Sequence, residues 1–365
     1  MPNILRAYAD LRGIPIEENV EDTLNNILVS LQNEPENVFE GPFRKELLSA
    51  CAVVLNGMPK IKDPVKLFKN LVLAFERRGY CIFTNTVRLA FKRLWAVAKK
   101  QNRTNEMIAI WRTIKNPFAR GENARYLPRE ELLQALKTRD DFVKEIAAET
   151  LVSRKDFTIK EIKALLSEKN FFIVKGAANG LAKRPDLPLR FLESLLSHPS
   201  EEIAAKAAFA IAIRKDINPD YLEKLIFCSK SKRSKINHCG VLYGIADAIR
   251  ERKDLPEKFL LKLITIKIPD KDLLYLNYYL IRYNAAYSLA MSGVSKSFIN
   301  NLLNRFPDES IRRAIIDAEK AKQRKAEEAK IAILKHIRGS RGKRKRTMEK
   351  LTSPLRTKKI KPKHA

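Results

Sequence analysis

The feature that most constrains this chain is a sequence repeat of 30 residues between Pro128 and about Ile226. Large apolar residues recur at that interval in two columns: Leu132, Ile162, Leu192, Leu222 and Leu136, Leu166, Leu196, Ile226. Pairs of alanines recur between these columns, at 147–148, 177–178 and 207–208. Repetition at 20–50 residues indicates stacked structural units, because one such unit cannot bury its apolar face alone.

Each repeat has the pattern of two helices. In the first, apolar residues such as Ile203, Ala207 and Ile211 follow helical spacing, and small alanines favour close packing of neighbouring backbones. The second begins with a helix-start signal: Thr158 and Glu161 fit a capping box, and Pro219 fits the first helical position. The repeats therefore predict an all-α fold of stacked helical pairs.

An Arg-x-Asp step closes each repeat. The residues are Arg154 and Asp156, Arg184 and Asp186, Arg214 and Asp216, and, after an insertion, Arg252 and Asp254. We interpret this as a structural ladder in which each charge favours its helix dipole and the arginine of one repeat pairs with the aspartate of the next. The alternative is a row of arginines that follows a phosphate backbone, and the equal number of acids argues against it.

The alanine pairs, the Arg-x-Asp steps and the leucine columns resemble the HEAT-like α-solenoid family, in its variants with repeats of about 30 residues. The resemblance covers roughly residues 128–264. It implies a right-handed α-solenoid. Because HEAT-like arrays serve importins, scaffolds, lyases and one class of DNA glycosylase, it implies a fold much more firmly than a function.

The rest of the chain extends this array. We expect five segments: an acidic N-terminal helical cap at 1–40; degenerate basic helical repeats at 41–127; HEAT-like repeats at 128–306, with a basic insertion near 228–238; a C-terminal capping helix at 307–338; and a disordered basic tail at 339–365. The tail prediction rests on its low hydrophobicity and high charge.

Charge points to acidic partners. The formal net charge is +29, and it is concentrated in two places, with a net of +12 in residues 41–115 and another +12 in residues 335–365. A basic excess of this size favours nucleic acid, RNA or DNA, as the partner.

Several basic residues are candidate nucleic-acid contacts. They are Arg88, Lys92, Arg93, Lys99 and Lys100 on a predicted helix over 86–100, Arg120 and Arg125 in a predicted loop PFARGENARYL, Lys230, Lys232, Arg233 and Lys235 in the insertion, and Lys343, Arg344, Lys345, Arg346, Lys358, Lys359 and Lys361 in the tail. The alternatives are a solvated helix face, a plain connection between repeats, and a nuclear-import signal.

Motifs for catalysis and metal binding are missing. The sequence contains no Walker, HExxH or Ser-His-Asp pattern, and Cys228, His238 and Cys239 do not make a zinc site. We expect no cofactor and no metal. Among HEAT-like enzymes, the alkylation-repair DNA glycosylases use aromatic residues and an aspartate, for which Trp95, Trp111, Asp140 and Asp141 are the available residues.

We therefore predict a non-enzymatic nucleic-acid-binding scaffold. Two alternatives stay open: an adaptor that binds partner proteins in its groove and uses the tail as a nuclear-import signal, and a HEAT-like DNA glycosylase. No run of 18 apolar residues predicts a membrane span, so we expect an intracellular protein, nuclear in a eukaryote, either monomeric or part of a larger complex. Ser353 lies before Pro354 and is a candidate phosphorylation site.

Overall fold

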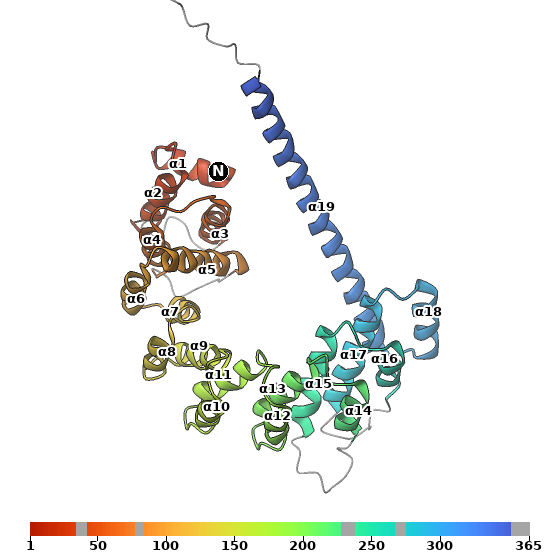
Figure 1. Cartoon of the computed structure of the whole chain (residues 1–365). Coiled ribbons are helices and arrows are strands. Elements are labelled where there is room, and N and C mark those ends of the chain that lie inside the picture. Colours follow the sequence, from red (N-terminus) through yellow and green to blue (C-terminus); the bar gives the residue numbers. More distant parts are fainter. Residues whose placement is uncertain (34–41, 77–83, 228–237, 267–274, 352–365) are drawn as a thin grey trace, which may run out of the picture. The chain divides into compact units, whose positions relative to one another are not determined.

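The computed structural model is all-helical. It describes residues 1–33, 42–76, 84–227, 238–266 and 275–351, and across those residues it contains nineteen helices and no strand (Figure 1). The all-α prediction from the repeat is confirmed.

The chain divides into two compact units, Met1–Arg214 with Lys232–Val241, and Lys215–Ser231 with Leu242–Ala365. The helices of the first unit are α1 (Asn3–Leu11), α2 (Val20–Asn33), α3 (Pro42–Gly57), α4 (Pro64–Glu76), α5 (Asn85–Lys100), α6 (Thr104–Thr113), α7 (Pro117–Ala124), α8 (Arg129–Ala135), α9 (Asp141–Val152), α10 (Ile159–Leu166), α11 (Phe171–Leu181), α12 (Leu189–Leu195) and α13 (Glu201–Ala212).

Helices of the first unit pack in sequence order. The helices α7, α9, α11 and α13 each contact the next one and form what we call the first-helix row, while α8, α10 and α12 pack against α9, α11 and α13. The alanine pairs of the sequence repeat lie in this row, and all six alanines are fully buried. Small side chains thus hold neighbouring first helices close together, as the repeat predicts.

The closest approach in the row is made by Gly176 of α11. A Cβ atom at this position would lie 2.0 Å from the carbonyl oxygen of Glu145 and 3.0 Å from the Cβ of Ala148, both on α9. The backbones of α9 and α11 therefore meet where no side chain intervenes, and a glycine is required there for steric reasons.

One predicted element of the first unit is wrong and one predicted helix start is confirmed. The segment PFARGENARYL, predicted as a loop, contains α7. Asn116 caps that helix by accepting from the backbone N–H groups of Phe118 and Ala119, and Pro117 takes the first helical position. Proline is compatible with that position, so here it starts a helix rather than ending one. The predicted capping box of Thr158 and Glu161 is present on α10.

The second unit contains α14 (Pro219–Phe227), α16 (Glu257–Ile264), α17 (Tyr275–Met291), α18 (Lys296–Arg305) and α19 (Glu309–Leu351), while α15 (His238–Glu251) belongs partly to each unit. Helix α17 packs against α16 and α19. Helix α19 continues to Leu351, beyond residue 338 where the sequence predicts disorder to begin. Disorder was predicted for this segment because a charged sequence of low hydrophobicity can bury little apolar surface. Lysine, arginine and glutamate nevertheless favour the helical backbone without burial.

The Arg-x-Asp steps bind backbone as well as side chains. Just after α11, Nε of the buried Arg184 donates to its own repeat's Asp186 at 2.9 Å, and Nη1 donates to the carbonyls of Val152, at 3.1 Å, and Arg154. In the second unit, Arg252 likewise pairs with Asp254 and donates to the carbonyl of Ile217. Arg184, Arg214 and Arg252 therefore link repeats by binding carbonyls of the preceding repeat. The predicted pairing with the aspartate of the next repeat is wrong for Arg154 and Arg184, which pair with the aspartate of their own repeat.

Replacing Gly176 with alanine tests the close approach in the row. We expect Gly176→Ala to lower the free energy of unfolding by roughly 1–3 kcal/mol, since the added methyl group would collide with a backbone carbonyl. Gly57→Ala is the matched control, because no atom lies within 4 Å of its added Cβ, and it should change stability by less than about 1 kcal/mol. Equal chemical-denaturation midpoints for the two variants would contradict the packing described.

A second pair of variants tests the arginine links. Arg184→Met should destabilise the protein by roughly 2–4 kcal/mol, because it leaves buried carbonyls without donors. Arg154→Met should cost no more than about 1 kcal/mol, since Arg154 forms an exposed pair with Asp156. Thermal unfolding of both variants measures the difference, and a larger effect of Arg154→Met would refute the assignment.

Candidate nucleic-acid interface

Helix α5 presents the main group of predicted contacts. Thr84 caps its start by accepting from the backbone N–H of Val87, and an apolar face that includes Phe91, Leu94 and Trp95 is buried. The opposite face is exposed and carries the cations. This arrangement agrees with the amphipathic pattern of the sequence.

The two arginines of α5 bind acceptors within this chain. Arg93 donates to the carbonyl oxygens of Leu55, at 3.0 Å, and of Asn56 and Met58, where α3 ends. Arg88 forms an ion pair with the buried Glu122 of α7 at 2.9 Å. Both were predicted as phosphate contacts, but their guanidinium groups bind acceptors of this chain.

The lysines of α5 face outward instead. Lys92, Lys99 and Lys100 are exposed. The segment after α3 lies beside them, because Gln101 donates to the carbonyls of Ile61 and Lys62, and it adds the exposed side chains of Lys60 and Lys62. We call Lys60, Lys62, Lys92, Lys99 and Lys100 the α5 lysine surface.

Carboxylates near this surface are occupied by other groups. Arg103 pairs with Asp63 at 2.8 Å and with Glu106 at 2.7 Å, and these bonds raise the pKa of the Arg103 guanidinium. The buried Glu21 accepts from the backbone N–H groups of Lys62 and Asp63. The surface therefore has a local excess of positive charge, which suits an anionic ligand.

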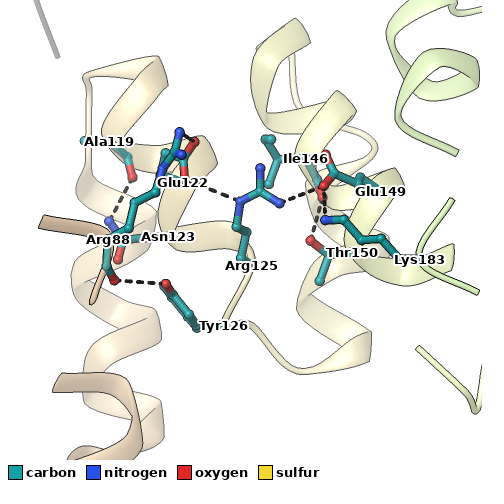
Figure 2. Close-up of polar contacts among 10 residues, drawn as sticks. All are labelled: Arg88, Ala119, Glu122, Asn123, Arg125, Tyr126, Ile146, Glu149, Thr150 and Lys183. Atoms are coloured by element: carbon teal, nitrogen blue, oxygen red, sulfur yellow. Dashed lines mark hydrogen bonds and ion pairs between the residues drawn. The ribbon is translucent and has the colours of Figure 1, made fainter. Parts of the chain in front are cut away.

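A chain of alternating charges connects α5 with the first-helix row (Figure 2). Arg125, at the end of α7, bridges Glu122 at 3.3 Å and Glu149 of α9 at 2.8 Å, and Lys183 after α11 also binds Glu149. Each carboxylate thus has two cationic partners. Arg125 was predicted as a phosphate contact, yet its charge is balanced here.

The pKa of Glu149 indicates how strongly the ion pairs in this network stabilise its charged form. Burial raises the pKa of Glu149, but hydrogen bonds from Lys183 and Arg125 outweigh it, and the net pKa lies below the usual glutamate value. The carboxylate therefore stays ionised and paired near neutral pH. These ion pairs form a structural network that ties α5, α7, α9 and the segment after α11 together.

Other predicted residues have structural surroundings too. The guanidinium of Arg120 lies 5.0 Å from the centre of the Trp111 ring, and the indole N–H of Trp111 donates to the Arg120 carbonyl. Trp95 is buried and donates to Asn123. Asp140 caps α9, and Asp141 pairs with Lys144. The aromatic and acidic residues considered for a glycosylase thus serve the core, a cap and a surface pair.

Several predicted positions lie outside the described residues. They are Lys230, Lys232, Arg233 and Lys235 of the insertion, Ser353, Lys358, Lys359 and Lys361 of the tail, and Cys228. Lys343, Arg344, Lys345 and Arg346 lie in α19, where only the backbone is described.

The part of the chain that the structure describes contains neither a set of side chains suited to bind a metal nor a helix suited to span a membrane. It brings together no group of three or more histidine, cysteine, aspartate or glutamate side chains suited to a metal ion. No helix there has the length and apolarity needed to cross a bilayer. Cys51 is fully buried, and burial raises the pKa of its thiol to about 12, so it is an unreactive core residue.

Comparisons with known proteins add little. No protein-family model matches the chain, and no curated protein matches it in sequence. Among solved structures, the crystal structure of an engineered protein aligns over 87% of this chain and 88% of its own, with 16% identity and a TM-score of 0.29. A similarity this low supports no inference about function.

Two members of the α5 lysine surface were not among the predicted contacts. Lys60 and Lys62 stand in the short connection Met58-Pro59-Lys60-Ile61-Lys62 between two predicted helices. Their alternation around the buried Ile61 is a signal that one side of this segment is exposed and basic. Only the fold shows that this segment lies beside α5.

The lowered pKa of Glu149 predicts a pH-dependent effect. The stability it contributes is fully present above about pH 4.3, the usual glutamate pKa, and is lost as the pH falls through its lower folded-state value. Glu149→Gln should cost roughly 1–3 kcal/mol at pH 7 and progressively less toward pH 3. The exposed Glu168→Gln is the control and should have little effect. Urea denaturation across pH measures both, and a Glu149→Gln deficit that stays constant with pH would contradict the prediction.

Proposed function

We propose that this protein is a non-enzymatic nucleic-acid-binding scaffold, and that the α5 lysine surface is the part of its folded body that contacts phosphates. In this proposal the stacked helical pairs form a right-handed, HEAT-like solenoid. The basic insertion at 228–238 and the basic residues from Lys343 onward provide further contacts. The tail clusters also suit a nuclear-import signal, and both uses require only clustered positive charge.

One observation supports this proposal above the others. Five exposed lysines lie on α5 and the segment beside it, while the neighbouring carboxylates are engaged by Arg103 and by backbone N–H groups. Elsewhere in the first unit, cations such as Arg88, Arg125 and Lys183 are balanced by carboxylates. Lysines that remain exposed, next to carboxylates that already have partners, are suited to contact the phosphates of nucleic acid. Each such contact releases counterions that are condensed on the nucleic acid.

Neutralising the lysines tests the proposal in the full-length protein. The triple variant Lys92→Gln, Lys99→Gln and Lys100→Gln should weaken binding to a DNA or RNA oligonucleotide. It should also reduce the slope of log affinity against log salt by roughly 0.9 per lost phosphate contact on duplex DNA, and about 0.7 on single strands. Fluorescence anisotropy over a range of salt concentrations measures both quantities.

A matched control removes the same charge from the second unit. The exposed lysines Lys224, Lys253 and Lys258, changed together to glutamine, should alter the salt slope much less. Equal effects of the two triple variants would show a general charge effect and exclude a specific α5 surface. If the parent protein binds no oligonucleotide at low salt, the adaptor alternative, with the tail as an address, replaces the proposal.

A further inference from the structure

A second surface of the first unit carries aromatic side chains beside cations. Three consecutive helices of the first-helix row begin with the same local pattern, a basic residue, an asparagine or aspartate, any residue, and phenylalanine. The segments are Lys115-Asn116-Pro117-Phe118 at α7, Arg139-Asp140-Asp141-Phe142 at α9 and Lys169-Asn170-Phe171-Phe172 at α11. The repeat thus places one cation and one aromatic ring at the start of each helix.

The caps fix these positions. Asn116, Asp140 and Asn170 are the N-cap residues of α7, α9 and α11, and each side chain accepts hydrogen bonds from backbone N–H groups of its own helix. The three helices also pack side by side, with α7 against α9 and α9 against α11. Their first turns therefore form a continuous edge, which we call the aromatic edge.

Aromatic rings on this edge are exposed to an unusual degree. Phe118 is 46% exposed and Phe171 is 63% exposed. Among the described residues, one other aromatic side chain is comparably exposed, that of Tyr243 in the second unit. The Phe118 and Phe142 rings lie 5.1 Å apart, and Phe142 rests on Gly121 of α7. The Phe171 and Phe172 rings lie 5.5 Å apart. Phe118 and Phe171 are thus accessible, and each is supported by a half-buried ring, Phe142 or Phe172.

Charge on the edge favours an anion. Arg139 and Lys169 are exposed at equivalent positions of successive repeats, and Lys137 is exposed close to Arg139. Of the acidic residues here, Asp140 is used as a cap and Asp141 pairs with Lys144, while Glu168 is exposed. Cations therefore exceed the carboxylates that have no role in the fold.

From these observations we infer that the aromatic edge binds single-stranded nucleic acid, with unpaired bases stacking on the exposed phenylalanine rings and phosphates contacting Arg139 and Lys169. This inference rests on the proposed function and specifies the form of nucleic acid. Aromatic platforms beside cations are the usual means of binding single strands without sequence preference, because every base has a π face. In a duplex those faces are covered by neighbouring bases, so an exposed ring has nothing to stack on.

A protein segment is the competing occupant, and the choice of substitution separates the two. A peptide would use Phe171 as an apolar contact, which leucine preserves. A base requires the flat ring, which leucine removes. The exposed cations Lys137, Arg139 and Lys169 outnumber the exposed Glu168 on this edge, and this excess of positive charge favours the polyanion.

The experiment compares full-length parent, Phe171→Leu and Phe171→Ala for binding to a single-stranded oligonucleotide and to a duplex of equal length. Both variants should bind the single strand roughly 5- to 150-fold more weakly, the usual loss for one base stacked on an aromatic ring, with an unchanged salt slope and unchanged duplex binding. Tyr243→Leu is the matched control at another exposed aromatic residue and should bind as the parent does. Because Phe171 is exposed, none of these changes should affect folding, which circular dichroism verifies.

A complementary variant tests the cations. Arg139→Gln with Lys169→Gln should lower the salt slope on the single strand by roughly 0.7 for each contact. Full single-strand binding by Phe171→Leu overturns the inference, whether or not Phe171→Ala weakens it, because stacking of a base requires the flat ring that leucine removes. Equal parental affinity for both forms of nucleic acid, with the Lys92, Lys99 and Lys100 triple variant still impaired, overturns the inference while the proposed function stands. A parent protein that binds neither form removes both.

Discussion

The arrangement of the first unit depends on the short distance between neighbouring first helices. Gly176 lets the backbone of α11 lie directly on the Glu145 carbonyl of α9, and the fully buried alanine pairs continue this close packing along the row. Helices that pack this closely at equivalent positions stay in register at both ends. As a result, Arg125, Glu149 and Lys183 meet at the C-terminal ends, and Phe118 and Phe142 meet at the N-terminal ends.

The two ends of the row use charge differently. At the C-terminal ends, Glu122 and Glu149 are each shared between two cations, and Arg184 and Arg214 bind carbonyls of the preceding repeat. These groups stabilise the stack and have little capacity left for a ligand. At the N-terminal ends the caps satisfy the backbone, and basic and aromatic side chains remain exposed. The groups that stabilise the stack and the groups that remain available to a ligand therefore lie at opposite ends of the same helices.

Much of the fold could be predicted from the sequence, because most of the apolar residues that recur in the repeat are buried between helices. The leucine columns, the alanine pairs and the Thr158–Glu161 capping box are short-range patterns with local physical causes. The site was harder to predict, since the partner of a cation depends on tertiary contacts. Arg88 and Lys92 look equivalent on a helical wheel and both are exposed, yet Arg88 is paired with a glutamate 34 residues away. The loop predicted at PFARGENARYL is wrong for a local reason, since Asn116 caps a helix there and Pro117 is compatible with its first position.

The central claim is that exposed, uncompensated lysines of the folded body contact nucleic acid, while paired lysines do not. Acetylation of lysines, measured residue by residue by mass spectrometry with and without a bound oligonucleotide, tests it most directly. The account predicts that nucleic acid protects Lys60, Lys62, Lys92, Lys99 and Lys100 and leaves Lys175 and Lys183, which are paired with glutamates, unchanged. Protection confined to lysines beyond residue 342, with the α5 lysine surface modified as in the free protein, would contradict it.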